Sequence, residues 1–71
     1  MDTIIVVNEH LIVSLLKEKN GIVLCQNIET GEFVTWAKDY HSGFGFCHGH
    51  YTFNLDSAIR DFNKRSFSIV W

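Results

Sequence analysis

Short runs of β-branched and aromatic residues, each bounded by turn residues, follow one another along this chain. They occupy residues 3–7, 11–16, 22–28 and 33–40, and an aromatic, glycine-punctuated run covers residues 43–51. Such runs predict β-strands. Between the second and third runs stands Asn20-Gly21, a pair that favours a two-residue hairpin because both residues tolerate positive φ. The pattern predicts a meander of antiparallel strands.

The run at residues 11–16, LIVSLL, fits two elements. Asn8 could cap a helix over this stretch, with its end marked by Asn20-Gly21. The same Asn-Gly pair, flanked by apolar runs, is a strong hairpin signal. We therefore favour a strand here, with the helix as the alternative.

After residue 53 the apolar period changes from strand-like to helical. The residues at i, i+3, i+4 and i+7 spacing, which predict one buried helix face, are Leu55, Ala58, Ile59 and Phe62. Asn54 is a suitable N-cap, and Phe53 and Ala58 occupy the two positions of a hydrophobic staple. The residues expected to face solvent are Asp56, Ser57, Arg60, Asp61, Lys64 and Arg65.

The strand that leads into this helix alternates in a simple way. One face is expected to carry Phe44, Phe46, His48 and His50, and the other Gly45, Cys47, Gly49 and Tyr51. Glycine inside a strand often marks the close approach of another element. The row of small residues therefore predicts where the helix packs, with the aromatic row on the opposite face.

These elements predict one α+β domain over residues 1–71. It contains an antiparallel sheet of four to five strands, one helix packed on one face, and a short C-terminal strand over residues 67–71. Residues 4–7 and 22–25 are apolar at every position, a pattern typical of strands that are buried on both faces. We therefore expect the face opposite the helix to contact a second copy in a homodimer, or a protein partner. The interface candidates are Trp36, Tyr40, Phe44, Phe46, His48 and His50.

Composition and charge narrow the classes of function. The net charge is −2 with six basic residues, which gives little support to phosphate binding. An aromatic sheet face that stacks on unpaired bases, in a small nucleic-acid-binding regulator, is the alternative to protein binding. No apolar run approaches the roughly 20 residues of a membrane span, and the N-terminus lacks the features of a signal peptide. With two cysteines in the chain, we expect a cytoplasmic protein with reduced thiols.

Residue types able to bind metal or act as nucleophiles are present, but their spacing is unfavourable. His48 and His50 share a predicted face from which Cys47 points away, and the chain has no Cys-x-x-Cys pair. A Cys–His pair from Cys47 or Cys25 would have little room for a substrate cleft in so small a sheet. We expect no metal, no cofactor and no enzymatic activity.

Several segments together resemble a known family. Residues 32–36 (EFVTW), 49–51 (GHY), 54–58 (NLDSA) and the Asp61-Phe62-x-x-Arg65 ending look like a family of small uncharacterised proteins encoded on phages and mobile elements of low-GC Gram-positive bacteria. Many short proteins of that genomic neighbourhood act against host defences, for example as anti-CRISPR inhibitors. The resemblance spans about half of the chain, from Thr30 to Arg65, and implies an inhibitor that binds a host defence protein. It implies no catalytic residues.

Overall fold

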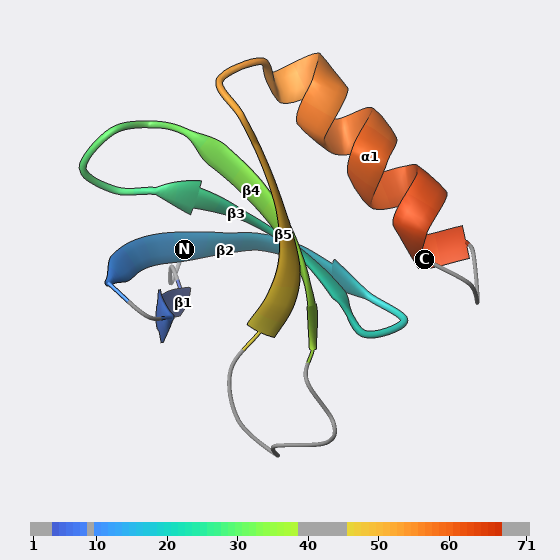
Figure 1. Ribbon diagram of the computed structural model, residues 1–71, viewed down its shortest axis with the longest axis horizontal. Helices are drawn as coiled ribbons and strands as arrows, with labels where there is room; N and C mark the ends of the chain where they lie inside the picture. Colours follow the sequence, from blue (N-terminus) through green and yellow to red (C-terminus); the bar gives the residue numbers. More distant parts are fainter. Residues whose placement is uncertain (1–3, 9, 39–45, 68–71) are drawn as a thin grey trace.

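The structure is a computed structural model that describes residues 4–8, 10–38 and 46–67 (Figure 1). The elements are β1 (Ile4–Asn8), β2 (Leu11–Lys19), β3 (Ile22–Asn27), β4 (Phe33–Lys38), β5 (Phe46–Thr52) and α1 (Leu55–Phe67). Each strand pairs antiparallel with the next, so the sheet order is β1-β2-β3-β4-β5. The predicted α+β class is confirmed: the described residues form five strands in a meander and one helix packed on the sheet.

The turns follow from local chemistry. Asn20 and Gly21 have φ values of 52° and 80°, so the hairpin between β2 and β3 forms as predicted and residues 11–16 are strand. In the next turn Gly31 has a φ of 82°. There, the side-chain oxygen of Asn27 accepts hydrogen bonds from the backbone N–H groups of Glu29 (2.8 Å) and Thr30 (3.1 Å).

The helix begins where the sequence predicts. Asn54 Oδ1 accepts a hydrogen bond from the Ser57 N–H at 2.9 Å, which caps the first turn. Ala58 and Phe62 are buried against residues of β3 and β4, namely Ile22, Leu24 and Ala37. This cluster is the core on the α1 side of the sheet.

Three details of the helix prediction are wrong. Leu55 is 45% exposed and Phe53 is 68% exposed, so neither anchors the first turn against the sheet. Arg65, predicted to face solvent, is buried. Phe67 is the last residue of α1 rather than the start of a strand, and the remaining residues of the predicted final strand, 68–71, lie outside the described residues.

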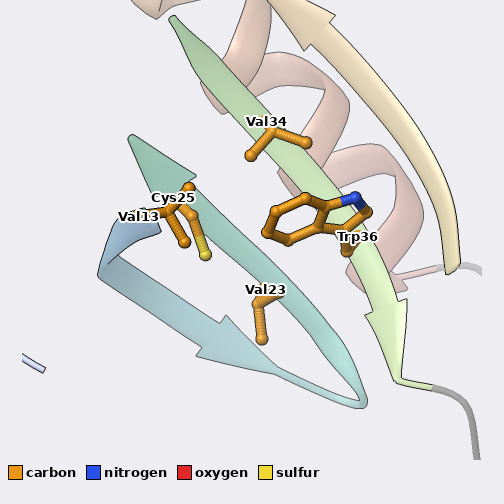
Figure 2. Packing of buried hydrophobic residues seen from close by; sticks show 5 residues of the cluster. All are labelled: Val13, Val23, Cys25, Val34 and Trp36. Atoms are coloured by element: carbon orange, nitrogen blue, oxygen red, sulfur yellow. The ribbon is translucent and has the colours of Figure 1, made fainter. Parts of the chain in front are cut away.

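A second core lies on the side of the sheet opposite α1. Its buried members are Val13, Val23, Cys25, Val34 and Trp36, and Figure 2 shows them on the face turned away from the helix. Each of these five residues is at most 2% exposed. The partly buried hydrophobic residues that pack against them also belong to strands, so the sheet itself covers this core. The sheet therefore rolls around its own side chains, as in part of a barrel.

Two irregularities favour this rolling. Between β2 and β3 the pairing passes from Leu15↔Cys25 to Lys17↔Leu24, which leaves Leu16 as an extra residue in β2. A second register shift occurs between β4 and β5. Such bulges bend a strand and increase its twist. The rolled sheet brings the first and last strands together at one end, where Asn8 Oδ1 accepts a hydrogen bond from the Phe46 N–H (3.3 Å).

The rolled sheet covers part of the apolar face opposite α1 without a second copy. We expected the apolar face opposite α1 to need a second copy or a partner to cover it. Val23 and Cys25 are covered within the single chain, so their burial gives no reason to expect a dimer.

Candidate functional site

The junction between α1 and the sheet contains a buried polar network centred on Arg65. Arg65 Nη1 donates hydrogen bonds to the Thr35 carbonyl oxygen (3.0 Å) and to Thr35 Oγ1 (2.9 Å). Its Nη2 donates to the His48 carbonyl oxygen at 2.7 Å. The guanidinium thus joins α1 to β4 and β5, while Nε has no hydrogen-bond partner among the described residues. A planar group with several fixed donors suits this position between two strands.

The network reaches the surface through Asp61 and His50. The Thr35 hydroxyl donates to Asp61 Oδ2, whose carboxylate also lies 2.9–3.1 Å from His50 Nδ1. The His50 side chain is 58% exposed. A histidine oriented by a carboxylate is a component of many general-base sites. Here, however, the hydroxyl of Thr35 is buried and engaged with Asp61 and Arg65, so the network fastens the helix rather than presenting a nucleophile.

The described residues offer little else for catalysis. Cys25 lies in the core opposite α1, and its burial raises the pKa of the thiol to about 12. A thiol that remains protonated at neutral pH is a poor nucleophile. Within residues 4–8, 10–38 and 46–67, no group of three or more histidine, cysteine, aspartate or glutamate residues is arranged to hold a metal ion.

The aromatic interface candidates lie in different environments. Trp36 is 2% exposed and is therefore a core residue, contrary to its predicted place on an open face. Phe46 is partly buried and stacks on it, with ring centroids 5.6 Å apart. Tyr51 meets Trp36 edge-on and accepts a hydrogen bond from its indole N–H at 3.3 Å. Tyr40 and Phe44 lie outside the described residues.

The predicted alternation of β5 is interrupted at His48. This residue has a φ of 55°, and between the pairs Thr35↔His50 and Ala37↔Cys47 β5 has one more residue than β4. Phe46 consequently lies on the face of Trp36, whereas His50 lies on the face of α1. The prediction that Phe46, His48 and His50 share one face is wrong for Phe46 and His50.

Gly49 also lies on the other face from the one predicted. A Cβ atom at this position would come within 2.6 Å of Tyr51 Oη and 2.7 Å of Trp36 Nε1. The glycine therefore makes room for the Trp36–Tyr51 pair, rather than for the helix. His48 and His50 are exposed, so they remain accessible members of the predicted interface set.

A contiguous apolar surface lies elsewhere, over β1, β2 and the residue that follows β3. We call it the aliphatic surface and define it as Ile5, Val7, Ile12 and Ile28, which are 52%, 68%, 41% and 53% exposed. Val7 pairs with Ile12. The Ile28 N–H donates to the Ile12 carbonyl oxygen at 3.0 Å, which places Ile28 beside Ile12.

The strand register assigns this surface to the α1 side of the sheet. Ile5 pairs with Ser14, Ser14 with Gln26, and Gln26 with Phe33, and directly paired residues share a face. Phe33 packs against the core beneath α1. The aliphatic surface therefore continues the sheet face that α1 covers only in part.

The apolar residues of this surface were visible in the sequence, but they predicted a different arrangement. The apolar residues at every position of 4–7 were taken to indicate two covered faces. In the structure the inward Val6 and Val13 join the rolled core, while Ile4, on the same face of β1, and the outward Ile5, Val7 and Ile12 remain exposed. The excess of apolar residues was visible, but which row would remain uncovered was not.

The described helix, α1, is too short and too polar to cross a membrane. No family model, curated protein or solved structure matches this chain.

Proposed function

We propose that this chain is a non-enzymatic protein-binding module whose partner contributes an amphipathic helix to the aliphatic surface. The observation that carries the proposal is the exposure of four neighbouring aliphatic side chains on a face that a helix already covers in part. Large contiguous apolar patches on a protein surface mark interaction sites.

The dimensions of the sheet support a helix as the occupant. Five strands spaced about 4.8 Å apart span roughly 19 Å between the outer strands. One helix is about 10 Å across and therefore covers about half of that width. The helix α1 packs mainly on β3, β4 and β5 and meets β2 at its last residue, where Lys19 Nζ lies 4.0 Å from the Phe67 ring centroid; β1 and the first part of β2 are left open. Figure 1 shows α1 and β1 at opposite ends of the sheet. A second helix beside α1 would complete the layer, with its apolar stripe on Ile5, Val7 and Ile12.

The other classes of function receive less support. The thiol of Cys25 is buried, and the hydroxyl beside the His50–Asp61 pair is engaged within the network. A nucleic-acid regulator would use Trp36, Phe44, Phe46 and Tyr51 as a stacking platform. Tyr51 is exposed, but Trp36 is buried beneath Phe46, and Phe44 lies outside the described residues.

The family resemblance suggests a host defence protein as the partner that binds this surface. An inhibitor of a host defence protein needs no chemistry of its own, since covering a helix that the target requires would block it. We propose such a role for the chain, with the partner's helix taking the place of a second α-helix on the sheet.

The proposal can be tested with a synthetic peptide. The probe is an amphipathic peptide of about four helical turns, with leucine along one face and balanced glutamate and lysine on the other. Methyl NMR spectra should show shifts confined to Ile5, Val7, Ile12 and Ile28 on titration with this peptide. A scrambled peptide of the same composition should leave these signals unchanged.

Two matched variants sharpen the test. Ile12→Lys places a charge in the middle of the aliphatic surface and should weaken peptide binding at least about tenfold. Phe53→Lys changes an apolar residue beyond β5 that is more exposed than Ile12, 68% against 41%, and peptide binding should be retained. Equal binding by the wild type and Ile12→Lys, or shifts distributed over other methyl groups, would contradict the proposal.

A further inference from the structure

The two edges of the sheet differ in how they are protected against pairing with another strand. At the β5 edge, a bulge and the left-handed His48 interrupt the strand, and Arg65 engages the His48 carbonyl. At the other edge β1 pairs with β2 without a register shift, from Ile4↔Leu15 to Asn8↔Leu11. Natural sheets protect their edges with charges, prolines or bulges. The sequence of β1, IIVVN, contains no charge or proline.

We propose that β1 pairs antiparallel with β1 of a second copy about a two-fold axis at Val6. The inference goes beyond the proposed function, because it concerns the edge of β1 rather than the face that would receive a helix. The product would be a continuous ten-stranded sheet formed from two five-stranded sheets.

The composition of β1 is compatible with pairing between β1 strands of two copies. A two-fold axis places Val6 opposite Val6 of the partner copy, and Ile5 opposite Val7. Ile4 would lie opposite Asn8, but Asn8 is buried and already contacts Phe46 of β5, so the pairing rests on Ile5, Val6 and Val7. Any charge near the axis would face its own equivalent or a close neighbour, and like charges in opposed positions destabilise a strand pair. Since β1 is uncharged and the whole chain has a net charge of only −2, repulsion between copies is small.

Apolar exposure on both faces of β1 supports the same partner. Ile5 and Val7 are exposed on the α1 side, and Ile4 is 59% exposed on the other side. Antiparallel pairing with a second copy would bring aliphatic neighbours to these residues on both faces and hydrogen-bond partners to the outward backbone groups of β1. It would also place the two aliphatic surfaces side by side, so that a dimer could engage two helices.

The test uses a charge pattern that depends on the register. Light scattering of the full chain at micromolar concentration should give twice the chain mass of 8.2 kDa. The double variant Ile5→Lys/Val7→Lys places lysine opposite lysine across the axis and should weaken dimerisation by at least about tenfold. Ile5→Lys/Val7→Glu places lysine opposite glutamate and should remain dimeric.

Each outcome has a separate meaning. A monomeric wild type, or a Lys/Lys variant that remains dimeric, would overturn β1 pairing. A Lys/Glu variant as monomeric as the Lys/Lys variant would overturn the register centred on Val6. Ile12→Lys lies outside β1, so a dimeric Ile12→Lys protein that no longer binds the helical peptide supports both proposals. Helix binding by a monomeric wild type would overturn the dimer alone.

Discussion

Replacement of Arg65 by methionine distinguishes the observed position of this residue from the one that helix periodicity predicts. Arg65 is 4% exposed and donates three hydrogen bonds, to two backbone carbonyl groups and one hydroxyl. Methionine retains a long apolar side chain but none of the donors. The variant therefore removes the polar contacts while most of the packing remains.

The expected loss of stability follows from the hydrogen-bond acceptors that lose the Arg65 donor. The carbonyl oxygens of Thr35 and His48 would lose a charged donor, and a buried acceptor without a partner costs about 1–3 kcal/mol. Asp61 Oδ2, which lies 3.9 Å from Arg65 Nη1, would lose a nearby cation. Relief of the buried charge offsets part of this loss. Breaking a buried ionic network at one member usually destabilises a protein by about 3–5 kcal/mol, and we expect a loss in that range.

Urea denaturation followed by circular dichroism measures this loss as a lower midpoint at an unchanged slope. Arg65→Lys should lose about half as much, because one ammonium group cannot bond carbonyls on two strands as the guanidinium does. Lys64→Met is the matched control at an exposed neighbouring position, and its effect should stay within about 0.5 kcal/mol. A loss below about 1 kcal/mol for Arg65→Met would refute the buried network.

Two further predictions concern the helix cap and the buried thiol. Asn54→Ala should reduce the free energy of unfolding by about 0.5–2 kcal/mol in the same assay, because Ser57 N–H loses its acceptor; an unchanged midpoint would contradict the cap. Burial raises the pKa of Cys25 from 9.0 to about 12, so the unfolded chain releases the proton first and stability falls as pH rises above about 9. Between about pH 8 and about pH 10 the wild type should lose roughly 1 kcal/mol more than Cys25→Val, and parallel pH profiles would contradict this assignment.

The sequence alone determined the features that depend on a few neighbouring residues. Asn20-Gly21 specified the turn between β2 and β3, which in turn made residues 11–16 a strand. Asn54 specified the start of α1, and Ala58 and Phe62 its buried face. These signals act over one turn of chain, because left-handed φ values and a capping oxygen require no distant partner.

The tertiary structure decided which residues end inside the molecule and which remain accessible. Arg65 is on the polar side of the helical pattern, but the carbonyls of Thr35 and His48, which are 30 and 17 residues away in the chain, converge on it and make burial favourable. Trp36 is a core residue rather than an interface residue because the sheet is curved around it. That curvature depends on bulges whose positions the apolar pattern does not reveal. That same rolling packed Val6 and Leu15 against the core and left Ile5, Val7 and Ile12 exposed, so the candidate surface follows from curvature, a property of all five strands together.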